Sequence, residues 1–264
     1  MLEVRKSEDR GVGKLDWLDA NFTFSFGPYK NPEQIGFSDL RLLNDDRVKG
    51  GGGFASHEHT DTEVFSYVLS GALEHKDSMG YGSVVNPGDV LTMSAGSGIT
   101  HSEFNASKSE PVHLLQIWIL PEASGLAPGY EQKHFPAEAR SGTLCLVASR
   151  GGRDGSVAIH QDVDLYASLL APGQSVSLAL RSGRHAWVQL ARGTLELSGA
   201  LLEAGDGAAL SAERELRLTA TDAGGLAEGA READREALRK VALGRARPEL
   251  AQRGVERLGR LLGQ

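Results

Sequence analysis

The chain has 264 residues, a formal net charge of −7 and 40% hydrophobic residues, enough for a packed core in one domain or two. The acidic balance argues against nucleic acid as a direct partner. The sequence has no run of roughly 20 apolar residues, the length a membrane helix needs. One cysteine, Cys145, leaves no intrachain disulfide, and an N-terminus without an apolar leader favours the cytoplasm.

The first 50 residues predict strands and loops. Phe22, Phe24 and Phe26 alternate with Thr23 and Ser25, which is the period of a half-buried strand. The aromatic side chains are expected to pack in a core. The 33 glycines of the chain suit many short strands joined by tight turns.

Two glycine-bounded segments then carry closely spaced pairs of metal-ligating side chains. The first contains His57 and His59, and the second contains His101 and Glu103. Residues i and i+2 of a strand share a face, so two neighbouring strands would bring three imidazoles and one carboxylate together. Such a donor set suits a divalent first-row metal and leaves positions open for water, O₂ or substrate.

Residues 53–93 predict a strand, a hairpin and a further strand, and 111–120 (PVHLLQIWIL) predict a central strand. A Pro- and Gly-rich stretch follows and predicts a domain boundary. Residues 132–222 resemble a weaker second copy, because Val188–Glu196 is similar to the segment that ends at Glu74. The second copy has only His185 where the H-x-H pair is expected, which predicts no metal there.

The last segment, 225–264, differs in composition from the rest of the chain. It is rich in Ala, Arg, Glu and Leu, and apolar residues recur every three or four positions. This period predicts a helical C-terminal tail.

The histidine motifs and several further segments resemble the pirin family of bicupins. The segments are WLDANFTFSF, LNDD, SHEH, YVLSG, HKDSMG and MSAGSGITHSE. The resemblance implies an all-β fold of two jelly-roll barrels in tandem, with a metal-binding cupin domain at 1–125 and a second cupin domain without ligands at 132–222. The family usually ends in an apolar strand of the type LLFDL; none is recognisable here, so the last strand of the second barrel is expected to be missing.

For the metal, the resemblance implies a shell of His57, His59, His101 and Glu103. One divalent transition metal is expected, Fe(II) in the first place, while Ni, Cu, Zn, Mn or Co also suit this shell. The family is similar in activity to quercetin 2,3-dioxygenases, which implies cleavage of a flavonoid substrate with O₂ and release of carbon monoxide. The alternative is a metal-dependent regulatory protein that acts through a protein partner, as implied for eukaryotic pirins.

Further roles follow from this hypothesis. Glu103 is expected to act as the catalytic group that takes a proton from the flavonol hydroxyl. Glu63 is the alternative fourth ligand, and is otherwise a structural carboxylate or, like His113, a group that supports the ligands by hydrogen bonding. An apolar pocket for a flat aromatic substrate is expected from Phe54, Phe65, Met93 and Ile99.

Overall fold

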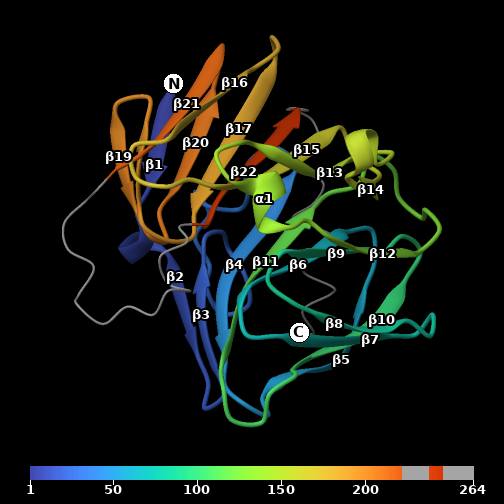
Figure 1. The fold of residues 1–264 in the computed structure, drawn as a ribbon. Helices are drawn as coiled ribbons and strands as arrows, with labels where there is room; N and C mark the ends of the chain where they lie inside the picture. The colour runs from blue at the N-terminus through green and yellow to red at the C-terminus, as the bar shows by residue number, and fades with distance from the viewer. Residues whose placement is uncertain (222–237, 246–264) are drawn as a thin grey trace.

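The computed structural model describes residues 1–221 and 238–245. These residues form four β-sheets, which make up two barrels in tandem (Figure 1). Each barrel combines a seven-stranded sheet with a four-stranded sheet. The predicted all-β fold of two cupin barrels is therefore confirmed.

The first barrel pairs the sheet β12-β9-β6-β11-β4-β3-β2 with the sheet β5-β10-β7-β8. Its strands are β2 (Gly11–Lys14), β3 (Leu18–Phe22), β4 (Leu40–Val48), β5 (Gly53–His59), β6 (Glu63–Ser70), β7 (Leu73–Asp77), β8 (Gly82–Val85), β9 (Asp89–Ser94), β10 (Ile99–Asn105), β11 (Val112–Ile119) and β12 (Gly129–His134).

The second barrel pairs the sheet β1-β20-β17-β22-β15-β13-β14 with the sheet β16-β21-β18-β19. Its strands are β1 (Leu2–Arg5), β13 (Cys145–Arg150), β14 (Val157–Ile159), β15 (Val163–Leu169), β16 (Ser175–Ala179), β17 (Arg184–Leu190), β18 (Thr194–Leu197), β19 (Ala200–Glu203), β20 (Gly207–Ser211), β21 (Glu215–Ala220) and β22 (Leu238–Arg245). The helical turns are η1 (Ser7–Asp9), α1 (Ala137–Arg140) and η2 (Arg153–Gly155). No helix within the described residues is long and apolar enough to cross a membrane.

The two barrels exchange one edge strand each. β1 precedes the first barrel in the chain but pairs with β20 of the second, from Leu2 opposite Leu210 to Arg5 opposite Gly207. β12 precedes the second barrel but pairs with β9 of the first. Each strand covers an edge that would otherwise expose unpaired backbone groups, and the exchange ties the barrels together.

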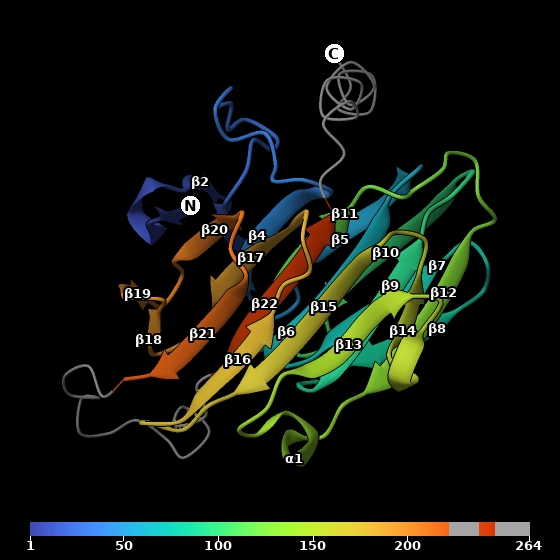
Figure 2. The ribbon, with the colours of Figure 1, turned by 90° about the horizontal axis from the view of Figure 1, so that it is seen from above.

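The two seven-stranded sheets pack against each other, and Figure 2 shows their strands running through the middle of the molecule. Alternate residues of each sheet enter the core between the barrels, among them Phe65 and Ile117 from the first barrel and Leu165 and Trp187 from the second. The other faces of the same strands line the barrel interiors, because successive side chains of a strand point to opposite sides.

The structure corrects one prediction about the C-terminal segment. Within the predicted helical tail, residues 238–245 form strand β22, between β15 and β17 (Figures 1 and 2, red). The helix prediction is wrong for these residues, and the expected gap at the last strand position is filled. The spacing of apolar residues in this segment, LRKVALGR, fits a strand as well as a helix. Because β22 pairs with a strand on each side, the backbone N–H and C=O groups of all three strands find partners, and this outweighs the local helical preference. The rest of the predicted helix, 225–237 and 246–264, lies outside the described residues.

Candidate metal centre

Three histidines converge inside the first barrel. Strand β5 carries His57 and His59 with their side chains on one face, and the neighbouring strand β10 places His101 directly opposite His57. One ring nitrogen from each of the three histidines lies within 4.8 Å of the other two. The Nε2 atoms of His57 and His101 are 3.0 Å apart.

Two of the three imidazoles, those of His59 and His101, have the protonation state that a metal requires. Burial, followed by the charge of His57, lowers the pKa of His59 to about 4. Burial and the neighbouring imidazoles lower the pKa of His101 to about 2. Both rings are therefore neutral at physiological pH, and a neutral imidazole offers a lone pair to a metal.

The orientation of His57 supports the same conclusion. Its Nδ1 lies 2.8 Å from the carbonyl oxygen of Ala55, and because a carbonyl only accepts, Nδ1 carries the proton. The Nε2 of His57, the nitrogen left to face a metal, lies toward the other two rings. Three imidazole nitrogen donors in a barrel interior fit a divalent first-row transition metal.

Glu103 lies on the same strand as His101 and enters the same interior. Its carboxylate accepts hydrogen bonds from the Ser66 hydroxyl on β6 and the Gln116 amide on β11. Burial raises the pKa of Glu103 to about 7, although these two hydrogen bonds oppose the shift. The carboxylate is thus directed toward Ser66 and Gln116, beside the cluster of three imidazoles, and its role as a metal ligand stays a prediction.

Apolar side chains border the imidazoles on one side. The predicted pocket residues Met93 and Ile99 pack in one cluster with Val64 and Ala95, and Trp118 lies against that cluster. The Trp118 ring meets the His59 ring edge-on, with centroids 4.9 Å apart and planes at 81°. Trp118 was not predicted as a site residue, because the sequence of its strand does not show which face turns inward.

The other two predicted pocket residues, Phe65 and Phe54, do not belong to this cluster. Phe65 is fully buried in the core between the barrels, on the opposite face of β6 from Val64 and Ser66. Phe54 lies opposite Glu103 in the pairing of β5 with β10 and packs edge-on against Trp17, with centroids 5.2 Å apart, so its place in the pocket stays a prediction. Only Met93 and Ile99 of the predicted set therefore gather beside His59.

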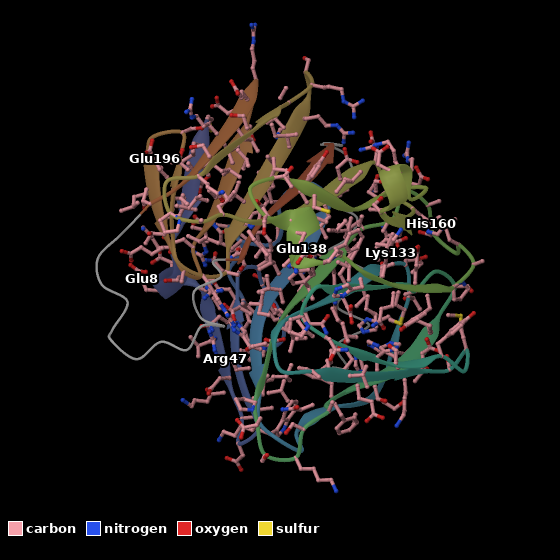
Figure 3. The ribbon with its side chains drawn as sticks, in the orientation of Figure 1. Glu8, Arg47, Lys133, Glu138, His160 and Glu196 are labelled. Carbon is pink, nitrogen blue, oxygen red and sulfur yellow. The ribbon has the colours of Figure 1, made fainter. Side chains whose placement is uncertain are left out.

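Glu63 and His113 do not contact the imidazole cluster. Glu63 accepts hydrogen bonds from the Ser94 hydroxyl at 2.6 Å and from the backbone and ring of His160 at 3.3 and 3.1 Å. His160 follows β14 of the second barrel and is labelled in Figure 3. Glu63 is therefore a structural carboxylate between the barrels, which was one of the roles predicted for this residue.

His113 likewise faces away from the barrel interior. Its Nε2 lies 2.7 Å from a carboxylate oxygen of Asp45, which also pairs with Arg10 and Arg47. The predicted support of the metal ligands by His113 is not seen. The residues of β11 that do contact the site are Gln116 and Trp118, on the opposite face of the strand.

We expect Glu63→Gln to lower the free energy of unfolding by about 1–2 kcal/mol, because an amide leaves at least one buried donor without its acceptor. Urea denaturation of the two proteins measures the difference. Glu196→Gln is the matched control, since Glu196 is exposed on the second barrel (Figure 3). Equal stability of Glu63→Gln and the control would contradict the structural role.

A fourth imidazole lies next to the cluster and was also missed. His75 is fully buried on β7, opposite Glu103, with its ring centroid 5.2 Å from that of His101. On its other side it stacks on Tyr130 at 5.4 Å. The sequence gives little signal for His75, because the pairing of β7 with β10 can be known only from the fold.

Comparison with known proteins identifies the family. The Pirin family model matches residues 4–119, and the model of the quercetinase C-terminal cupin domain matches 146–226. A quercetin 2,3-dioxygenase of Escherichia coli K12 is 43% identical over 221 residues, covering 83% of this chain and 94% of that protein. A putative quercetin 2,3-dioxygenase of Pseudomonas aeruginosa is 40% identical, covering 84% of this chain and 96% of that protein. The crystal structure of the bacterial pirin YhhW of Escherichia coli in complex with nickel(II) superposes with a TM-score of 0.83 at 36% identity, covering 94% of this chain and all of that one (100%).

Proposed function

The chain belongs to the pirin family, and from this premise we propose that it is a metal-dependent dioxygenase of quercetin-like flavonols. The reaction consumes O₂, opens the heterocyclic ring and releases carbon monoxide. The observation that supports it most is the group of three imidazoles whose ring nitrogens lie within 4.8 Å of one another. These histidines belong to a chain that is similar to proteins named quercetin 2,3-dioxygenase or putative quercetin 2,3-dioxygenase.

His57, His59 and His101 would hold the metal, and Glu103 would complete the shell or stand beside it. We take Fe(II) as the resident metal in the cytoplasm; the nickel(II) complex of the related pirin makes nickel the first comparison. When bound, a divalent metal supplies Lewis acidity toward an oxygen of the substrate.

Glu103 is the group we assign to proton transfer. Its carboxylate enters the same interior as the imidazoles and is positioned by two hydrogen bonds, from Ser66 and Gln116. A carboxylate held in this way can take the proton of a flavonol hydroxyl as the oxyanion forms, provided that it lies within hydrogen-bond reach.

Trp118, Met93 and Ile99 are the side chains we assign to substrate binding. They are apolar and lie together beside His59. A flat aromatic ligand binds well to apolar side chains of this kind. Once bound, the ligand itself excludes water from the imidazole cluster.

We expect Trp118→Leu to raise KM for quercetin by roughly tenfold, because an aromatic contact contributes about 0.5–1.5 kcal/mol beyond its buried area. Steady-state kinetics at full metal occupancy measures the effect. Trp17→Leu is the control, since Trp17 packs on Phe54 in a different cluster. A KM that changes equally in both variants would contradict the assignment.

The proposed activity is tested on protein purified without oxygen, analysed for metal and then supplied with quercetin and O₂. One carbon monoxide per quercetin consumed, lost on chelation and restored by reloading, is the expected result. Bound metal with no carbon monoxide released would contradict the dioxygenase. It would favour a regulatory protein that uses the metal to control contact with a protein partner.

A further inference from the structure

The second barrel repeats the strand order of the first. Its four-stranded sheet β16-β21-β18-β19 corresponds to β5-β10-β7-β8, and in the larger sheets β20, β17 and β22 stand where β9, β6 and β11 stand. The place equivalent to the imidazole cluster therefore lies on β16 and β21.

The pairing of the strands identifies the equivalent residues. Leu73 and Leu195 correspond in the sequence repeat; Asn105 lies opposite the first and Ala220 opposite the second. Two and four residues before Asn105 on β10 stand Glu103 and His101, and the same steps back from Ala220 on β21 lead to Leu218 and Leu216. Across the ladders, His101 lies opposite His57 on β5, and Leu216 lies opposite Leu178 on β16. The residues two positions after His57 and Leu178 are His59 and Leu180.

The equivalent pairs are therefore His57 with Leu178, His59 with Leu180, His101 with Leu216 and Glu103 with Leu218. Every predicted ligand position of the first barrel thus holds leucine in the second. His185, which the sequence repeat placed at the H-x-H position, lies instead on β17, the equivalent of β6.

A cavity lies beside this place. It has a volume of about 440 Å³, and its lining among the described residues includes Leu178 and Leu180, the equivalents of His57 and His59, together with Tyr166, but not Leu216 or Leu218. Tyr166, Leu178 and Leu180 pack against the apolar core of the second barrel. The inner part of the cavity is therefore apolar where the first barrel is rich in imidazole.

Among the described residues, the cavity is also lined by three guanidinium groups, those of Arg153, Arg181 and Arg184, and by one carboxylate, that of Asp164. Arg153 pairs with Asp164 at 2.9 Å, and Arg184 donates to the side chain and the carbonyl of Asp162 at 2.6 Å each. Arg181 is exposed and forms no ion pair with any carboxylate of the described residues. The described part of the lining thus has a net positive charge, and within it the Arg181 guanidinium is available to an anion.

We infer that this cavity is a second ligand site, which binds a small organic carboxylate with an apolar body. The body would lie on Leu178, Leu180 and Tyr166, and the carboxylate would accept hydrogen bonds from Arg181. Guanidinium and carboxylate match in geometry, and such a pair is stronger than a neutral hydrogen bond. The site is independent of the metal and of the proposed dioxygenase reaction.

The test is isothermal titration of the full-length, metal-loaded protein with 2-naphthoate, with 2-naphthamide as the neutral analogue. We expect one naphthoate per chain and much weaker binding of the amide. Arg181→Gln should weaken naphthoate binding about fivefold and Arg181→Glu by about 20-fold or more. Because Arg181 is exposed, both variants should fold, which their thermal unfolding checks.

Two control variants show whether naphthoate binds in this cavity or at another place on the protein. Arg217→Glu makes the same charge change at an exposed position on β21 and should leave binding unchanged. His59→Ala should also bind naphthoate normally, which excludes a carboxylate held by the metal. The inference is overturned if naphthoate does not bind, if the amide binds equally well, if Arg181→Glu has no effect, or if His59→Ala abolishes binding.

Discussion

His59→Ala is expected to remove stoichiometric binding of the divalent metal and, with it, turnover of quercetin. His59 is one of three imidazoles whose nitrogens lie within 4.8 Å of one another, and burial keeps its ring neutral by lowering its pKa to about 4. Losing a hydrogen-bond partner of a metal ligand costs about 10–100-fold in metal affinity, so losing a ligand should cost more than about 100-fold. Titration of chelator-stripped protein with Fe(II) or Ni(II) measures the affinity.

The control for this variant is His134→Ala. His134 is an imidazole on β12 that lies outside the cluster and pairs with Asp89, so the same substitution there should leave metal binding unchanged. Thermal unfolding in the presence of chelator checks that both variants are folded. Full metal occupancy in His59→Ala at the wild-type affinity would mean that the metal binds elsewhere.

Glu103→Gln is expected to lower kcat by about 10²–10⁴-fold, the usual contribution of a group that transfers a proton. Gln has almost the same shape as Glu but cannot take a proton. In the variant, the new amide side chain occupies the place of the carboxylate beside Ser66 and Gln116. The measurement is kcat at saturating metal and quercetin, so that any loss of metal affinity is separated from loss of chemistry.

Glu74→Gln is the matched control for Glu103→Gln. Glu74 belongs to β7, the neighbour of β10, but is partly exposed and pairs with Lys76. It should retain wild-type kcat. An unchanged kcat in Glu103→Gln would remove Glu103 from proton transfer.

The H-x-H and H-x-E spacings were informative because each pair lies within one strand, where residues two apart share a face. The spacing between His59 and Glu63 was misleading, because it crosses a turn. Asp61 in that turn has a positive φ of 48°. His59 ends β5 in the four-stranded sheet, whereas Glu63 begins β6 in the seven-stranded sheet, on the face that turns toward the second barrel. A spacing of four keeps its meaning only if the strand continues.

The residues that sequence reasoning missed come from other strands. Ser66, Gln116 and Trp118 lie on β6 and β11, and His75 lies on β7. Each reaches the site through pairings between segments far apart in the chain, which local patterns do not encode. Strand β22 was missed for a related reason, because its place between β15 and β17 overrides a local helical period.

Binding of one metal ion by His57, His59 and His101 together is the basis of the proposed function. Crystals of metal-loaded protein, measured at the absorption edge of that metal, would locate the ion. One anomalous peak at about 2.0–2.2 Å from a ring nitrogen of all three histidines is predicted, and the same map would show whether Glu103 is a ligand. A peak at another place, or none at these imidazoles in fully loaded protein, would contradict a metal site in the first barrel.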